Sequence, residues 1–459
     1  MQRLGCRNYR HSALGRRAFL GTGLGGLSAP LVFHSPADGS DSGRPPTGTA
    51  VIQYWLNGAA SHFETYDPKP DAPAEVRGPF QPIATNVPGT QICETLPLHA
   101  KLMDKVTILR SVHHDNSDHQ HGMHWCQTGH DAKANGVNPF KSSSHPSSGS
   151  VTAMLRGPNH PGLPPYVLIG YPLDKQGVHR FFPHRAAYLG VKYNPLEILK
   201  KRTGDGKDPG LDKDFRVRSL DPIAGMTRKK LLDRRKLLAQ FHTQLERRPT
   251  TSWDHFHRSA FDLVTGESTG SAFDLEKEDA KTRARYGHNR SGQTALLARR
   301  LVEAGVTFVT VIDPGVGLSS SGWDLHTKLE WGMKTACPRM DRAVTTLIED
   351  LHERGMHRNV LVVVWGEFGR TPTINKKAGR DHWAGVQSAM LAGGPYRHGQ
   401  VLGSSTDKGE VPRDRPLWPY DVVATMYHHL GIDPRLTPDT AAGRSKPLLD
   451  KGDVIRELL

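Results

Sequence analysis

The pattern that most constrains the fold of this chain is a helix followed by glycine and then by a short apolar run, which occurs twice. Residues 294–304 (TALLARRLVEA) have helical periodicity, end at a glycine and lead into the β-branched run 306–312. Residues 340–354 also end at a glycine and precede the apolar run 360–365. This alternation is typical of βαβ units, so it predicts a doubly wound, mostly parallel sheet with helices on both faces.

Further segments extend this α/β pattern in both directions along the chain. Short apolar runs at 51–56, 106–109 and 166–169 predict three more strands. None of them alternates cleanly between apolar and polar residues, which indicates strands covered on both faces. Helical patterns at 231–248 and 419–430 predict two more helices.

Composition divides the chain into a leader, a linker and one large domain. Residues 1–36 are predicted to be a leader, and residues 37–49 are rich in Ser, Gly and Pro, as linkers are. The α/β domain is expected over residues 50–459. Within it, residues around 200–290 are polar and weakly patterned, so they are predicted to be an insertion with helical segments.

The leader has the layout of an export signal. Arg16 and Arg17 are followed by Phe19-Leu20 and by a glycine-rich, weakly apolar run over 21–33. Adjacent arginines before such a run resemble the twin-arginine signal, which the twin-arginine export machinery recognises on folded proteins. An amphipathic helix is the alternative, but glycine costs about 1 kcal/mol per helical position. The predicted location is therefore periplasmic or extracellular.

Charge and hydropathy exclude some classes of protein. The formal net charge is +14, and removing the five arginines of residues 1–36 leaves 14 − 5 = +9. This fits an anionic substrate, or simply a solvated basic face. No nucleic-acid-binding motif occurs, and neither does an apolar run of about eighteen residues, so no transmembrane segment is expected. The chain also has no P-loop, dinucleotide fingerprint or nucleophile elbow.

The cysteines do not form a disulfide framework. Cys6 lies in the leader, which leaves Cys93, Cys126 and Cys337 without CxxC spacing. One bridge between two of these three would still be possible. Cys126 lies within a histidine-rich segment, where a free thiol could lie near a site.

Polar residues that suit a metal site follow several predicted strands. Ligands in open α/β sheets bind beyond the carboxyl ends of the strands, where these residues would gather. Carboxylates and imidazoles from several strand ends can hold a divalent cation such as zinc, calcium or manganese. The predicted ligands are Asn57, His121, Asp324, His326, Glu367, Asp381 and His382.

Each of these groups also has a structural interpretation. The histidines of residues 113–130 could be solvated loop residues, and Asp324 with His326 could form an exposed turn. Glu367 follows an apolar strand and Gly366, and an acid there is costly unless it is paired or ligates a metal. Arg370 could neutralise Glu367. The metal interpretation rests on the four strand-end groups taken together.

Four motifs resemble the domain-of-unknown-function 1501 family over essentially the whole mature chain. They are Leu56-Asn57-Gly58 with the following Thr65-Tyr66-Asp67-Pro68, Trp323-Asp324-Leu325-His326, the stretch 366–372 (GEFGRTP) with 379–383 (GRDHW), and Leu391-Ala392-Gly393-Gly394. The twin-arginine leader is also typical of that family. The resemblance implies a distant relationship to the alkaline phosphatase and sulfatase superfamily, with an alkaline-phosphatase-like sheet and metal at its strand ends.

The chain departs from the superfamily pattern at the expected reaction centre. Asn57 stands where the superfamily has an Asp ligand, and Glu367 stands where it has an Asp-His pair. The sulfatase motif Cys-x-Pro-x-Arg is missing, and the position of the sulfatase nucleophile corresponds to His119. Ser111 and Ser117 are the candidate hydroxyl nucleophiles.

Two functions are compatible with these residues. The first is an exported metal-dependent hydrolase of sulfate or phosphate esters, possible substrates including a sulfated polysaccharide. In it, His119 or His121 would be a ligand or general acid, while Arg370 and Arg380 would hold the anionic group by forked hydrogen bonds. The alternative is a non-catalytic exported binding protein that retains the fold. The absence of repeats disfavours a structural protein of the cell surface.

Overall fold

The computed structural model describes residues 48–459 apart from residues 137, 140, 171–181, 200–226, 228, 235, 238–266, 314, 317–321 and 439–445. The predicted leader, most of the linker and most of the predicted 231–248 helix lie outside these described residues. So does the larger part of the predicted insertion.

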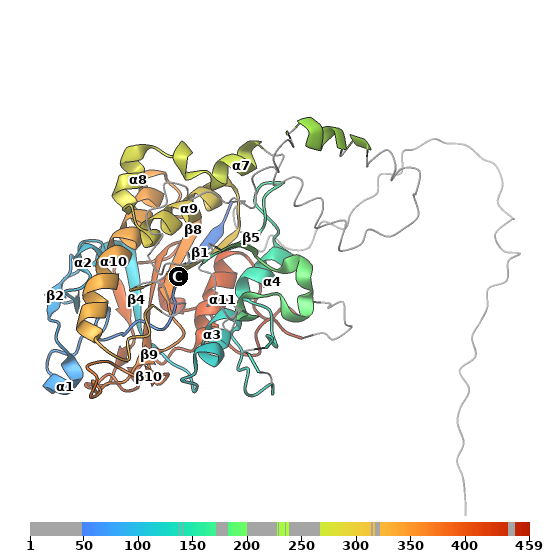
Figure 1. The fold of residues 1–459 in the computed structure, drawn as a ribbon. Coiled ribbons are helices and arrows are strands. Elements are labelled where there is room, and N and C mark those ends of the chain that lie inside the picture. Colours follow the sequence, from blue (N-terminus) through green and yellow to red (C-terminus); the bar gives the residue numbers. More distant parts are fainter. Residues whose placement is uncertain are drawn as a thin grey trace, which may run out of the picture. The chain divides into compact units, whose positions relative to one another are not determined.

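An eight-stranded sheet forms the centre of the domain (Figure 1). In spatial order its strands are β12 (Gln400–Leu402), β4 (Val106–Val112), β11 (Gln387–Gly393), β8 (Val360–Trp365), β1 (Ala50–Leu56), β7 (Phe308–Asp313), β5 (Tyr166–Gly170) and β6 (Leu196–Leu199). Only β11 runs antiparallel to its neighbours in this sheet. The predicted α/β class and mostly parallel sheet are therefore confirmed.

Helices cover both faces of the sheet, because the central strands are apolar on both sides. In β1, Ile52 and Tyr54 pack into one hydrophobic cluster, whereas Val51 and Trp55 pack into another on the opposite face. The first cluster includes α9 (Arg290–Ala304) and α10 (Leu329–Glu353). The second includes α3 (His119–Thr128), α4 (Ser148–Leu155) and α11 (Pro419–His429).

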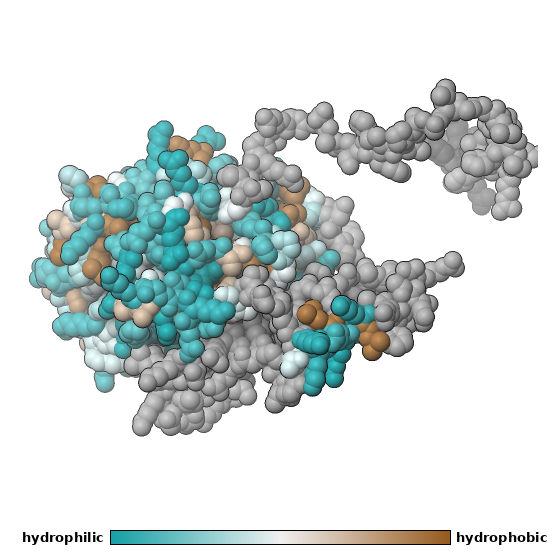
Figure 2. Space-filling model, turned by 90° about the horizontal axis from the view of Figure 1, so that it is seen from above, coloured by the Kyte–Doolittle hydropathy of each residue, from teal (hydrophilic) through white to brown (hydrophobic). Residues whose placement is uncertain are grey.

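Smaller elements surround this core. The helices are α1 (Ala74–Arg77), α2 (Pro97–Lys101), α7 (Glu267–Phe273) and α8 (Ala280–Tyr286). The two-stranded sheets pair β2 (Pro82–Ala84) with β3 (Gln91–Cys93), β9 (Gly369–Arg370) with β10 (His382–Trp383), and β13 (Ser404–Ser405) with β14 (Pro412–Asp414). On the face that Figure 2 shows, hydrophobic residues are scattered among hydrophilic ones.

Several boundaries differ from the sequence predictions. Helix α10 begins at Leu329, well before the predicted residue 340, and continues through Pro338. Proline usually ends a helix. Met333 and Cys337, which precede Pro338 in α10, are fully buried, and their burial stabilises the first turns of this helix. Strand β11 was not predicted, because its sequence begins with Gln387 and Ser388 and resembles a loop.

Cys93, Cys126 and Cys337 are buried free thiols. Among the helices that the structure describes, none combines the length and hydropathy needed to cross a bilayer.

Buried histidines should make the fold sensitive to acid. Burial lowers the pKa of His184 to about 3 and of His124 and His429 to about 4. Since these values lie below the usual 6.5, the unfolded chain takes up protons first as the pH falls, so stability is lost below about pH 6.5. Between pH 7 and 5 each such histidine should cost about 2 kcal/mol, measured by urea unfolding. His429→Gln should reduce this loss, whereas an unfolding midpoint that is independent of pH over this range would contradict the prediction.

Candidate metal centre

Polar residues meet where β1, β4, β7 and β8 end. Glu367 lies two residues after the end of β8, His119 begins α3 after the loop that leaves β4, and Asp324 lies in the segment between β7 and α10. His382 forms part of β10, whose partner β9 lies just after Glu367. The fold thus brings together residues that are more than 260 positions apart along the chain.

His119 is held by the carboxylate of Glu367. Its Nδ1 donates to Glu367 Oε1 at 2.7 Å, and the same oxygen accepts a hydrogen bond from the backbone nitrogen of Gly58 at 2.8 Å. On its other side, His119 Nε2 lies 3.2 Å from Asp324 Oδ2. The Glu367 side chain is 1% exposed, and its second oxygen, Oε2, has no hydrogen-bond partner among the described residues.

His326 and His382 are oriented in the same manner. Nδ1 of His326 donates to Asp381 Oδ1 at 2.6 Å, and Nδ1 of His382 donates to the Ser117 carbonyl oxygen at 2.8 Å. Their Nε2 atoms lie 2.9 Å from each other. The same Nε2 atoms lie 3.0 Å and 3.1 Å from Asp324 Oδ1.

Asp324 is the point on which these imidazoles converge. Arg370 Nη2 also donates to Asp324 Oδ1 at 2.6 Å. Burial alone would raise the pKa of Asp324, but hydrogen bonds from His119 and His382 and the charge of Arg370 hold that pKa far below its usual range. Burial would likewise lower the pKa of His119, yet the carboxylates of Asp324 and Glu367 outweigh it and raise that pKa to about 9.

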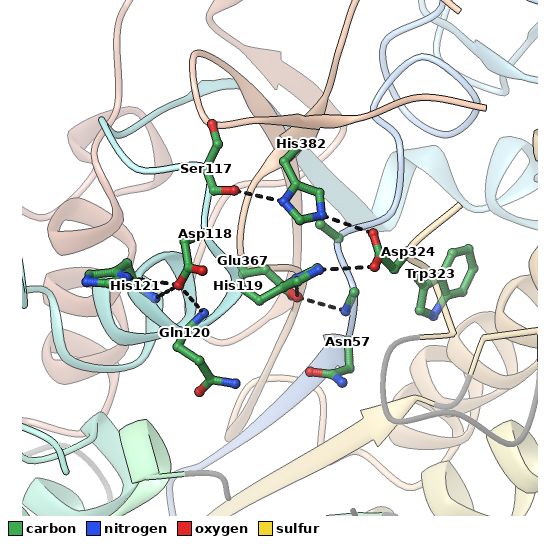
Figure 3. Close-up of polar contacts among 12 residues, drawn as sticks. Asn57, Ser117, Asp118, His119, Gln120, His121, Trp323, Asp324, Glu367 and His382 are labelled. Atoms are coloured by element: carbon green, nitrogen blue, oxygen red, sulfur yellow. Dashed lines mark hydrogen bonds and ion pairs between the residues drawn. The ribbon is translucent and has the colours of Figure 1, made fainter. Parts of the chain in front are cut away.

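We call His119, Asp324, His326 and His382 the histidine–aspartate cluster, of which Figure 3 shows His119, Asp324 and His382. One donor atom from each of His119, Asp324 and His382 lies within 4.8 Å of the others, and His326 adds a further Nε2. Because every Nδ1 donates to an oxygen, an imidazole in its neutral form directs its Nε2 lone pair toward the Asp324 carboxylate. Converging lone pairs repel one another unless a cation lies among them, so this geometry suits a metal ion or a proton.

Local structure positions α3 for this role. Asp118 caps the helix by accepting hydrogen bonds from the backbone nitrogens of Gln120 and His121. One turn later, a Cβ on Gly122 would lie 2.7 Å from the backbone oxygen of Glu367. Only glycine therefore allows α3 to approach the end of β8 closely enough for His119 to reach Glu367.

Three predicted site residues lie outside the cluster. Asn57 Oδ1 accepts from Trp55 Nε1 at 3.1 Å, and His121 Nδ1 contacts Asp118 Oδ1 at 2.9 Å, so both face away from Asp324 (Figure 3). Ser117 contributes its carbonyl oxygen, whereas its hydroxyl accepts from the backbone nitrogen of Ala384 at 2.9 Å and points away.

The two arginines predicted to hold an anionic group are occupied within the protein. Arg380 is fully buried and forms an ion pair with Glu64 at 2.6 Å, and its remaining donors bind the carbonyl oxygens of Thr371, Pro372 and Val76. Arg370 is 1% exposed and binds Asp324 and the backbone oxygens of Gly58, Ala59 and Arg380. Their placement differs from the prediction because burial leaves neither guanidinium accessible to a ligand.

Three other histidines of residues 113–130 contact backbone oxygens. His114 contacts the Glu367 carbonyl at 2.6 Å, His124 that of His130 at 2.8 Å, and His130 that of Leu448 at 2.9 Å. Ser111, the other candidate nucleophile, donates its hydroxyl to the Arg415 carbonyl at 2.5 Å. Of this histidine-rich segment, only His119 reaches the cluster.

Sequence reasoning missed two features of the site. Glu367 and Asp381 were predicted as ligands, and the structure places one carboxylate oxygen of each against Nδ1 of His119 and His326, respectively. Phe368 was not singled out, although its ring lies 5.1 Å from that of His119 and 4.8 Å from that of His382. Its position directly after Glu367 in the GEFGRTP motif was the available clue.

Solved structures similar to this chain include three enzymes. PsFucS1 sulfatase from Pseudoalteromonas sp. is 12% identical with a TM-score of 0.39, and the match covers 85% of this chain and 69% of that one. Lipoteichoic acid synthase LtaP from Listeria monocytogenes is 11% identical (TM-score 0.39; 84% and 72% covered). Phosphonate monoester hydrolase SpPMH from Silicibacter pomeroyi is 12% identical (TM-score 0.37; 86% and 75% covered).

No curated protein matches the sequence. Residues 48–459 match the family described as "Protein of unknown function (DUF1501)". This match covers nearly the whole described domain, so the chain belongs to the DUF1501 family, as its motifs predicted.

Proposed function

We propose that this protein is a metal-dependent hydrolase of sulfate or phosphate esters whose cation is held by the histidine–aspartate cluster. The observation that carries this proposal is the convergence of three imidazole Nε2 atoms on one carboxylate, each imidazole being anchored through Nδ1. Metal-binding histidines characteristically donate their second ring nitrogen to a carboxylate or carbonyl oxygen in this way.

The donor set favours particular metals. Three imidazoles and one carboxylate suit zinc or manganese, whereas calcium prefers six to eight oxygen ligands. The unpartnered Oε2 of Glu367, buried beside His119, offers a further oxygen at the edge of the site. Of the metals expected from the sequence, zinc and manganese therefore fit these residues better than calcium.

The residues of the site have different roles in the proposed reaction. A bound divalent cation supplies Lewis-acid polarisation of a sulfuryl or phosphoryl oxygen. Glu367 orients His119, Arg370 fixes Asp324, and Asp381 orients His326, so the cluster is held in place before the substrate arrives. His326 and Asp381 have side chains that are 40% and 54% exposed, which makes their side of the cluster the accessible one.

The proposed substrate class rests on charge and on the family motifs. The chain carries an excess of positive charge after the leader is removed, and its motifs resemble those of a family related to ester hydrolases. A sulfated polysaccharide is one substrate of this class. The leader further supports export by the twin-arginine machinery to the periplasm or the cell exterior.

A metal-binding protein without hydrolytic activity is the second candidate. One observation favours it, since the hydroxyl of Ser117 points away from the cluster and binds the Ala384 nitrogen instead. Because this hydroxyl is not placed as a nucleophile, hydrolysis would require direct attack by water on the ester. The experiments below separate metal binding from turnover.

Removing a cluster ligand should abolish stoichiometric metal binding. Elemental analysis of the full chain equilibrated with zinc should find about one zinc per molecule, as in other single-ion zinc sites. Asp324→Ala and His382→Ala should lose it, because each removes a converging donor atom. His121→Ala is the matched control, since this imidazole on the same helix lies outside the cluster and should leave the zinc content unchanged. Equal zinc in all three variants would disprove the assignment.

The metal-loaded chain should hydrolyse aryl sulfates or aryl phosphates. Release of nitrophenol from nitrophenyl sulfate and nitrophenyl phosphate should fall by roughly 100-fold or more in Asp324→Ala, because Lewis-acid assistance contributes several kcal/mol. Chelation should abolish the activity and added zinc should restore it. A chain that binds zinc but releases no nitrophenol from either ester would support the second candidate.

Glu367→Gln should weaken metal binding without unfolding the protein. The substitution removes the negative charge that orients His119, and loss of such a partner typically costs about 10–100-fold in metal affinity. Competition with a chelator of known affinity measures this change, and thermal melting tests the fold. Glu353→Gln on the surface of α10 serves as the control. Unchanged zinc affinity in Glu367→Gln would show that Glu367 does not orient a ligand.

A further inference from the structure

Two loops meet at the accessible side of the histidine–aspartate cluster. One is residues 322–328, which carries Asp324 and His326, and the other is residues 371–381, which leads to His382. The backbone nitrogens of Lys328 and Leu329 donate to the backbone oxygens of Lys377 and Ala378 at 3.3 Å and 2.8 Å. These hydrogen bonds join the loops into one continuous surface.

This surface is rich in lysine. Lys328, Lys376 and Lys377 are all exposed, and no ion pair joins any of them to a carboxylate in the described part of the chain. Lys328 is only two residues from His326, and Lys377 is four residues from Asp381. Positive charge without internal partners therefore lies directly beside the exposed ligand His326.

The backbone of this surface is unusual as well. Lys328 and Ala378 both have φ of 53°, in the left-handed region that residues with a Cβ rarely adopt. Gly379 follows, where a Cβ would lie 2.1 Å from the backbone carbon of His326. The close approach of the two loops thus requires specific backbone geometry, and that geometry fixes where the lysines emerge.

An exposed tryptophan extends the surface. Trp331, in the first turn of α10, is 59% exposed. This turn packs against the loop that carries Asp324. A Cβ on Gly332 would lie 2.5 Å from the Leu325 side chain, so the two segments are in close contact. An indole ring exposed to this extent offers a flat face for the apolar side of a sugar ring.

We propose that Lys328, Trp331, Lys376 and Lys377 form a subsite, here called the lysine–tryptophan ledge, for a sulfated oligosaccharide. The lysines would bind an anionic group next to the ester at the cluster, and Trp331 would stack on a sugar ring. This inference rests on the proposed function in placing that ester at the cluster. It assigns anion recognition to lysines, because Arg370 and Arg380 are buried and fully engaged.

Charge around the ledge distinguishes a carbohydrate from a nucleic acid. Glu330 lies beside Trp331, where it is 56% exposed and paired with Lys334 at 2.6 Å, and Asp381 is 54% exposed. These carboxylates can accept hydrogen bonds from sugar hydroxyls, which are numerous on an oligosaccharide and few on a nucleic-acid backbone.

The ledge can be tested without catalysis. The probe is a heparin octasaccharide, and its affinity for the full chain carrying Asp324→Asn is measured by calorimetry. Adding Lys376→Ala with Lys377→Ala should weaken binding by about tenfold and reduce its dependence on salt, because two charge-assisted contacts are lost. Trp331→Ala should also weaken binding, while Trp331→Phe should retain most of it. The matched control is Lys101→Ala with Lys281→Ala, which removes the same charge from α2 and α8, and it should change affinity less than about twofold.

Some outcomes would overturn the ledge and not the proposed function. Equal weakening by the control pair would mean that the octasaccharide responds only to net charge. Two results would contradict recognition of a sulfated carbohydrate. One is that single-stranded DNA of equal charge binds as tightly as the octasaccharide, and the other is that the desulfated octasaccharide does so. Loss of zinc binding or ester hydrolysis in the earlier experiments would leave these affinities unchanged, so the two proposals fail separately.

Discussion

The site depends on one electrostatic constraint, which is that three imidazole lone pairs point at a single carboxylate. Each imidazole donates its Nδ1 proton outward, to Glu367, Asp381 or the Ser117 carbonyl. In the neutral form of each imidazole, the inner nitrogen therefore carries a lone pair and no proton. A metal ion would make this arrangement favourable, and without one the carboxylates of Asp324 and Glu367 raise the pKa of His119, which favours a proton on this imidazole.

The fold supplies the convergence through close backbone approaches. Gly122 lets α3 touch the backbone after β8, and Gly379 lets the loop before His382 touch the backbone of His326. The buried Arg380–Glu64 ion pair fastens that same loop to residues that follow β1. Removing one partner of such a buried pair is strongly destabilising, because it leaves an uncompensated charge. The GRDHW motif therefore serves both the scaffold and the cluster.

Charge is used differently inside and outside the site. Arg370 and Arg380 donate their hydrogen bonds to Asp324, Glu64 and backbone carbonyls, so they fix the positions of these groups within the protein. The lysines of the ledge are exposed and have no such task. A buried arginine fork suits a fixed internal network, whereas flexible lysines can adapt to anionic groups that vary in position. This division explains why the arginines predicted from the motif to bind substrate do not face solvent.

The sequence by itself determined the class of fold and most members of the cluster. The two helix–glycine–strand repeats predicted parallel strands, because the period of apolar residues changes where a helix gives way to a strand. Polar residues at strand ends then indicated Asp324, His326 and His382, and the family motif pointed to His119. Strand β11 escaped prediction, because its place between β4 and β8 depends on partners far along the chain. Only the tertiary structure decided which polar residues face inward. Spacing in the sequence cannot separate His119 from His121, or a metal ligand from the carboxylate behind it, since that depends on which ring nitrogen meets which oxygen after the loops have packed.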